Sequence, residues 1–114
     1  MISGDKYNKK KVTSGRKLAQ ECEWDCEKRS VALIKRLNLP LDTDVYIRKA
    51  NAYILSFHLL EKYGKWYTSK NKPSINPMIL AMMPNKIVKD PNNIDPELLD
   101  FMAKECKMRK RMKK

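Results

Sequence analysis

The stretch from Asp44 to Gly64, DVYIRKANAYILSFHLLEKYG, is the longest uninterrupted segment with a helical apolar period. Apolar side chains recur at spacings of three and four, which is the pattern of one buried helix face: Tyr46, Ala50, Tyr53, Phe57 and Leu60. Further apolar residues widen this face beyond a two-helix seam: Ile47, Ile54, Leu55 and Leu59. We therefore predict one long helix with neighbours on more than one side.

Both ends of this predicted helix carry the residues that helix ends need. Asp42 or Thr43 can cap the start, because a short side-chain oxygen accepts a hydrogen bond from a first-turn N–H. Gly64 supplies the end, since glycine enters the left-handed conformation that commonly terminates helices. The polar residues are expected to keep one face in solvent: Arg48, Asn51 and Lys62.

A second helix is predicted upstream, from near Ser14 to about Arg36. Its apolar stripe, with Ala19, Val31 and Ile34 beside it, is Leu18, Cys22, Cys26, Leu33 and Leu37. Its outer face begins acidic and ends basic, which complements the helix dipole: Glu21, Glu23, Asp25 and Glu27, then Lys28, Arg29, Lys35 and Arg36. Asn38 and Pro40 break this helix. The short connection predicts an antiparallel or steeply crossed helix pair.

The chain after Gly64 predicts a loop followed by two shorter helices. Trp66, Tyr67 and the polar residues that follow indicate an exposed loop or a short hairpin. Asn76 and Pro77 begin a short helix that Pro84 ends. Residues 85–94 are a linker, and the triplet 95–97 begins a C-terminal helix with an apolar stripe: Leu98, Leu99, Met102 and Cys106. We expect a small all-α domain over residues 14–106, with a basic flexible arm over 1–13 and a basic tail over 107–114.

The formal net charge of +12 is concentrated near the two ends of the sequence. Residues 1–17 hold six bases against one acid, and residues 107–114 hold six bases and no acid. The residues between them carry 13 bases and 12 acids, so that the predicted helical body is nearly neutral. Two basic ends on a neutral body indicate a polyanionic partner, with nucleic acid favoured over an anionic membrane surface. Terminal lysines that only aid solubility, or that serve as a nuclear address, remain the alternative.

The size and cysteine content indicate an intracellular protein of one domain. The sequence has 114 residues, no apolar run long enough to span a membrane, and no apolar segment typical of a secretory signal. Three cysteines without regular spacing favour reduced thiols over a disulfide framework. No membrane partner is expected.

The candidate nucleic-acid contacts are the basic residues near the two ends and in the loop after Gly64. Aromatic rings between lysines suit base stacking together with phosphate neutralisation. Trp66 is expected to close the core, and Tyr67 to be the more open ring. The full candidate set is Lys9, Lys10, Lys11, Arg16, Lys17, Lys65, Tyr67, Lys70, Lys72, Lys107, Arg109, Lys110, Arg111, Lys113 and Lys114.

The motifs of enzymes and of metal sites are missing from the sequence. His58 has no partner motif for a nucleophile, and we expect it on the polar edge of the central helix. Cys22 and Cys26 supply one close pair where a structural zinc site has two, so buried free thiols are expected. Acidic residues at every second position of a helix cannot converge on one magnesium ion. No glycine-rich phosphate loop is present. We expect a non-catalytic protein without metal or cofactor.

The region from about residue 38 to residue 80 resembles the small subunits of bacteriophage DNA-packaging terminases. The resemblance consists of a helix ending in glycine, a short Thr/Ser-Lys-Asn segment and an Asn-Pro pair that opens the next helix: Gly64, Thr68, Ser69, Lys70, Asn71, Asn76 and Pro77. It implies an oligomeric, non-catalytic DNA-recognition subunit in the host cytoplasm, which presents viral DNA to a larger motor and nuclease subunit. Two other classes stay open: an RNA-binding component of a ribonucleoprotein, and a transcription-associated protein that docks on a polymerase.

Overall fold

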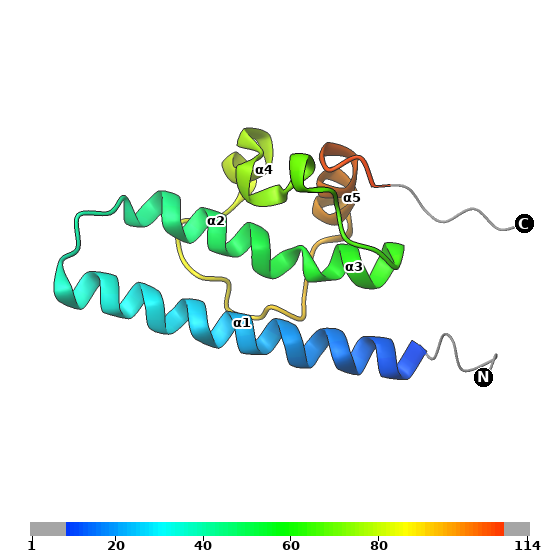
Figure 1. Cartoon of the computed structure of the whole chain (residues 1–114), viewed down its shortest axis with the longest axis horizontal. Helices are drawn as coiled ribbons and strands as arrows, with labels where there is room; N and C mark the ends of the chain where they lie inside the picture. The colour runs from blue at the N-terminus through cyan, green and yellow to red at the C-terminus, as the bar shows by residue number, and fades with distance from the viewer. Residues whose placement is uncertain (1–8, 109–114) are drawn as a thin grey trace, which may run out of the picture.

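The computed structural model describes residues 9–108 and forms them into helices joined by turns (Figure 1). The α-helices are α1 (Lys9–Leu37), α2 (Thr43–Leu55), α3 (Phe57–Tyr63), α4 (Pro77–Met82) and α5 (Pro96–Glu105). Two 3₁₀ turns, η2 (Ser69–Asn71) and η3 (Pro73–Ile75), lie between α3 and α4. Within residues 9–108 there is no strand, so the predicted all-α class is confirmed. The loop after Gly64 is accordingly not a hairpin.

The helices α1 and α2 form the antiparallel pair that the short connection predicted, and they lie side by side (Figure 1). Asn38 ends α1 in the left-handed conformation, with φ of 51°. The Leu39 N–H donates to the Ile34 carbonyl at 3.1 Å, a bond that closes the last turn. Asp42 then caps α2 by accepting a hydrogen bond from the Val45 N–H.

The helix α1 begins at Lys9 rather than near Ser14. Residues 9–13 lack an apolar period, which is why the sequence suggested an arm there. Lysine is a good helix former, however, and the Thr13 hydroxyl donates to the Glu61 carboxylate of α3 at 3.0 Å. This contact attaches the first turns of α1 to the rest of the fold. The expected arm over residues 1–8 lies outside the described residues.

The apolar stripe predicted to be buried on α1 lies on its exposed side instead. Leu18, Leu33 and Leu37 are 69%, 44% and 55% exposed, and the Cys22 and Cys26 thiols are exposed as well. The face that packs on α2 and α3 includes three buried residues: Gln20, Val31 and Ile34. The buried face was missed because part of it is polar. Gln20 is fully buried, and its side-chain amide donates to the Ile54 carbonyl at 2.8 Å.

The predicted central helix is interrupted at Ser56, where α2 ends and α3 begins. The Ser56 hydroxyl donates to the Tyr53 carbonyl at 2.5 Å and so engages an oxygen at the end of α2. A serine that bonds back to its own helix commonly bends it. Gly64 ends α3 in the left-handed conformation, with φ of 72°, as the sequence predicted.

Asn51 and Arg48 were expected in solvent, but both bind the backbone of later segments. The Asn51 side chain has no exposed area, and the Arg48 guanidinium donates to the carbonyls of Leu80 and Met83 at 3.1 and 2.9 Å. Amide and guanidinium groups are tolerated there because they satisfy carbonyls that would otherwise be buried without a partner. Lys62 is exposed, as predicted.

The main core lies between α2, α3, α4 and α5. The buried residues of this cluster are Ala52, Leu55, Leu59, Ile79, Met83, Met102, Ala103 and Cys106. Asn76 caps α4 through the Ile79 N–H, and Asp95 caps α5 through the Glu97 N–H, which confirms both predicted helix starts. No helix in the part of the chain that the structure describes is long and apolar enough to cross a membrane.

Residues 84–94, here called the strap, contain no helix and include residues 85–94, which were predicted as a linker. The strap runs across α1, α2 and α3 and is attached to each of them. The Trp24 indole N–H of α1 donates to the Val88 carbonyl at 2.7 Å, and His58 of α3 bonds to the Pro91 carbonyl at 2.8 Å. The strap is therefore a structural part of the fold, and not merely a connection.

Candidate nucleic-acid interface

The loop after α3 carries the exposed aromatic ring of the candidate site. Gly64 turns the chain out of the helix, and the next residues, Lys65 and Trp66, are exposed. The Trp66 ring is 42% exposed, so the expectation that it closes the core is wrong. Lys70 and Lys72, further along the same loop, are exposed too. An indole with flanking ammonium groups is the arrangement that stacking on a base and pairing with phosphate require.

Two ring contacts hold Trp66 in place, and a third supports Phe57. The Tyr53 and Phe57 rings pack edge to face with their centroids 5.4 Å apart, and the Phe57 and Trp66 rings pack in the same way with their centroids 5.3 Å apart. The Tyr67 ring then contacts Trp66 at 5.4 Å. Edge-to-face contacts of this kind are favourable and leave the remaining ring surface open. The indole is thus supported by its neighbours while a large part of it stays in solvent.

Tyr67 is the more buried of the two loop aromatics, contrary to expectation. Its ring packs against the main core and is partly buried. Burial raises the pKa of the Tyr67 hydroxyl, and a hydrogen bond with the Ser56 side chain acts in the opposite direction. The two aromatics have exchanged roles because the loop turns Tyr67 inward, so Tyr67 supports Trp66 rather than offering a free face.

Arg16 was predicted as a phosphate contact but is held inside an intramolecular network. Its guanidinium donates to Glu61 at 2.6 Å, to Gln20 at 2.7 Å and to Asn92 at 2.8 Å, and its side chain is only 9% exposed. Burial acts to raise the pKa of Glu61, but the hydrogen bonds from Arg16 and Thr13 outweigh it, and the pKa is lowered. Arg16 is therefore a structural residue that joins α1, α3 and the strap.

The remaining predicted bases fall into two groups. Lys11 and Lys17 are exposed on the first turns of α1, and Lys107 is exposed just after α5. The side chains of Lys9 and Lys10 lie outside the described side chains. Five further predicted contacts lie beyond the described residues: Arg109, Lys110, Arg111, Lys113 and Lys114.

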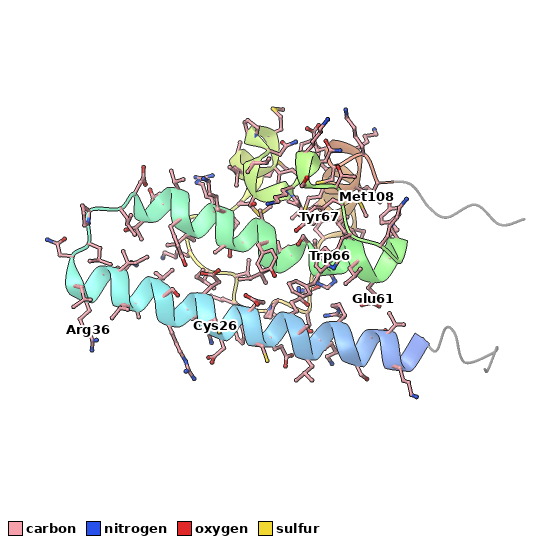
Figure 2. All side chains as sticks on the ribbon, in the orientation of Figure 1. Cys26, Arg36, Glu61, Trp66, Tyr67 and Met108 are labelled. Atoms are coloured by element: carbon pink, nitrogen blue, oxygen red, sulfur yellow. The ribbon has the colours of Figure 1, made fainter. Side chains whose placement is uncertain are left out.

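The structure brings the ends of three elements to one end of the molecule. The start of α1, the end of α3 and the last described residues after α5 all lie toward the same end of the long axis (Figure 1). The α1–α2 turn lies at the opposite end (Figure 1). Two ion pairs join these elements: Arg16 with Glu61, and Lys62 with Asp100 at 3.1 Å. We call this region the terminal end. Glu61, Trp66 and Met108 lie on its side of the molecule (Figure 2).

Sequence reasoning missed this grouping, and with it Lys104. That residue lies in the last turn of α5 and is exposed, whereas Met102 and Ala103 beside it are buried. The apolar periodicity of α5 could have predicted the exposure of Lys104, because a base that directly follows two core residues lies on the outer face of the helix. The grouping itself required the antiparallel arrangement and could not be read from residue spacing.

The burial of His58 and of two of the three cysteines differs from the prediction. His58 is buried, 8% exposed, instead of lying on a polar edge. Burial lowers the pKa of His58, while the hydrogen bond to the Pro91 carbonyl acts to raise it. Cys106 is buried as predicted, whereas the expectation of burial for Cys22 and Cys26 is wrong. Among the described residues, no three His, Cys, Asp or Glu side chains are grouped as a metal site would require.

Comparison with known proteins adds no relative: no protein-family model, no curated protein and no solved structure matches this chain.

Proposed function

We propose that this protein is a non-catalytic nucleic-acid-binding protein whose contact surface is the terminal end. The observation that supports this most is the exposed Trp66 residue, which follows the exposed Lys65 in the chain and lies on the side where the described chain begins and ends. The start of α1 and the last described residues after α5 lie toward this same end (Figure 1), and the sequence is basic over residues 1–17 and 107–114. A polyanion that contacts Trp66 therefore meets the end of the fold at which the described chain enters and leaves.

Aromatic stacking and phosphate pairing contribute different parts of such a contact. Stacking of a base on an aromatic ring is worth about 1–3 kcal/mol and is tolerant of sequence. Lysine–phosphate pairs add affinity that depends on salt, because bound counterions are released. Since both contributions are largely independent of base sequence, we propose a contact that positions nucleic acid rather than reads it.

The salt dependence of binding tests this proposal. Replacing Lys65 and Lys107 by Ala in one variant, K65A/K107A, should lower the slope of log affinity against log salt by roughly two for duplex DNA, if each lysine neutralises one phosphate. Fluorescence anisotropy of a labelled DNA duplex, repeated with RNA of the same sequence, measures this slope.

The matched control is K35A/R36A, which removes the same charge from the exposed last turn of α1 at the opposite end. We expect its slope to equal that of the unmodified protein. An unchanged slope in K65A/K107A, or an equal loss in both variants, would place the contact elsewhere or show only a diffuse attraction. Undetectable binding by the unmodified protein at low salt would exclude the function itself.

DNA is the substrate that we propose over RNA, in accord with the resemblance to terminase small subunits. That resemblance concerns the helix that ends at Gly64 and the helix that Asn76 and Pro77 open. A terminase small subunit would prefer duplex DNA in the same assay and would assemble into a ring. A stronger affinity for RNA would favour the ribonucleoprotein alternative.

A further inference from the structure

The exposed side of α1 carries an apolar stripe that nothing in the described chain covers. Leu18, Cys22, Cys26, Leu33 and Leu37 define this outer stripe, and all five are exposed. They recur at spacings that place them along one side of a helix, over roughly 28 Å at 1.5 Å per residue. Cys26 and Arg36 are seen on the side of α1 that faces away from α2 (Figure 2). A continuous exposed stripe of this length is typical of a contact surface.

A hollow of about 240 Å³ lies in the second half of the outer stripe and is lined by Arg29, Ala32, Leu33 and Arg36. These four residues occupy positions i, i+3, i+4 and i+7 of one helix. That spacing defines the hole into which a side chain of a facing helix inserts when two helices pack knobs-into-holes. The hollow therefore has the residue spacing of a site that accepts one side chain from another helix.

The charges beside the outer stripe are acidic in its first half and basic in its second. Glu21 and Asp25 precede Arg29 and Arg36 along the helix. A second α1 in the antiparallel direction would place acid against base, whereas a parallel one would place acid against acid. Asp25 and Arg29 pair within the helix at 3.0 Å, with side chains 50% and 80% exposed. An exposed pair of this kind is weak, so exchanging it for a pair between two helices loses little.

From these observations we propose that two copies of this chain associate through the outer stripes of their α1 helices, antiparallel about a two-fold axis near residue 27. In this register Asp25 of each copy faces Arg29 of the other, and Cys22 of each enters the hollow of the other. The stripe is self-complementary in this arrangement, which is the requirement for an isologous dimer. The terminal ends of the two copies then lie at opposite ends of the pair.

Charge reversal at the two-fold axis tests the pairing. Arg29→Glu leaves two acids facing each other across the interface, and Asp25→Arg leaves two bases, so that each variant alone should be monomeric. Mixing the two variants restores opposite charges at both contacts and should yield the heterodimer. Sedimentation velocity at micromolar to millimolar concentrations measures the assembly, and we expect each single reversal to raise the dimer dissociation constant by at least about tenfold.

The matched control is Lys35→Glu, an equal charge reversal at an exposed residue of α1 that lies off the outer stripe. It should leave the dimer intact. Arg29 and Lys35 are exposed and the Asp25 side chain is half-exposed, and circular dichroism checks that the helices persist. A monomeric unmodified protein, a mixture that stays monomeric, or a larger ring that none of the reversals affects would overturn the proposal.

Native cysteines report the register of the pair. Antiparallel pairing about residue 27 offsets the two Cys26 residues by only about 3 Å along the helix axis, but the two Cys22 residues by about 15 Å. Mild oxidation by diamide, which accepts the two electrons and two protons, should therefore link the copies through Cys26. Cys106 is buried, and burial raises its pKa to about 11, so it should stay unreactive.

Non-reducing electrophoresis then distinguishes the possible registers. The Cys22→Ser variant should form the linked dimer as the unmodified protein does, and Cys26→Ser should not. A linked dimer that persists in Cys26→Ser, or no linked dimer in the unmodified protein, would contradict the proposed register.

Discussion

Asn51 connects α2 to the strap through hydrogen bonds on both ends of its amide. Its nitrogen donates to the carbonyls of Pro84 and Lys86 at 3.1 and 2.9 Å, and its oxygen accepts from the Val88 N–H at 3.0 Å. The side chain is fully buried, so no water can take over these bonds. One residue thereby satisfies three backbone groups of a segment that has no secondary structure of its own.

We expect Asn51→Ala to lower the free energy of unfolding by roughly 3 kcal/mol, because it leaves buried backbone groups without partners. Urea denaturation followed by circular dichroism measures the change. Asn93→Ala, at an exposed residue of the same strap, is the control and should change stability by less than about 0.5 kcal/mol. Similar losses in the two variants would show that the amide does not hold the strap.

His58 gives the fold a sensitivity to mild acid. The Pro91 carbonyl can only accept, so the bonded nitrogen, Nε2, carries the ring proton at neutral pH. Burial lowers the pKa of His58, and the nearby Arg16 charge lowers it further, while Glu61 and Asp90 act to raise it. Because the folded pKa lies below the unfolded value of 6.5, the unfolded chain binds this proton more tightly. The contribution of neutral His58 to the free energy of unfolding is therefore fully present above pH 6.5 and is lost as the pH falls toward the folded pKa.

The variant His58→Gln should lose this pH dependence, because its side-chain N–H can still donate to the Pro91 carbonyl but cannot be protonated. Free energies of unfolding, measured from pH 8 down to pH 5 for both proteins, give the comparison. The unmodified protein should become less stable relative to the variant as the pH falls below about 6.5. A constant difference across this range would show that His58 does not titrate on unfolding.

The two described glycines, Gly15 and Gly64, have different backbone settings. Gly64 has φ of 72° at the end of α3, and an added Cβ would meet no atom within 4 Å, so only backbone strain opposes a side chain there. Gly15 lies inside α1 with the same open space and no positive φ. We expect Gly64→Ala to destabilise the protein by about 1 kcal/mol and Gly15→Ala to stabilise it by up to about 1 kcal/mol.

Thermal denaturation of the two glycine variants checks these opposite signs. A single sign for both would mean that backbone conformation does not govern either position. Gly64→Asn is a useful third variant, because asparagine tolerates the left-handed conformation better than alanine. It should fall between Gly64→Ala and the unmodified protein.

Helix ends could be read from the sequence far better than helix faces. Asp42, Gly64, Asn76 and Asp95 each act where their local chemistry placed them, because capping depends on residues within one turn. The buried face of α1 could not be read, since it depends on tertiary partners. Its outer stripe has the stronger apolar period, while the buried Gln20 is polar and is satisfied by a carbonyl of α2.

The candidate site was predictable in composition but not in arrangement. The excess of lysine near the two ends of the chain is evident from the sequence, and the exposure of Lys65, Lys70 and Lys72 was anticipated. The burial of Arg16 and the exposure of Trp66 were not: Arg16 is buried by contact with Glu61, 45 residues away, and the exposure of Trp66 depends on how the loop turns after Gly64. An arginine among lysines gives no local sign that Glu61 is its partner.

The whole molecule is elongated, with principal extents of 52 × 26 × 23 Å. The terminal end carries the candidate nucleic-acid contacts, and the outer stripe runs along the length of α1. These two surfaces are on separate parts of the molecule. A dimer formed through the outer stripe would leave both terminal ends free, so Arg29→Glu and Asp25→Arg should not affect nucleic-acid binding at the terminal end, and K65A/K107A should not affect the dimer.

Fluorescence of Trp66 tests the central claim most directly. Trp24 and Trp66 are the only tryptophans of the chain, so Trp24→Phe leaves Trp66 as the sole reporter, and Trp66→Phe is the matched control. If nucleic acid contacts the terminal end, titration with duplex DNA should quench the emission of Trp24→Phe, leave that of Trp66→Phe nearly unchanged, and be reversed by salt. Quenching in Trp66→Phe alone, or binding by anisotropy without any change in Trp24→Phe, would contradict the assignment of the terminal end as the contact surface.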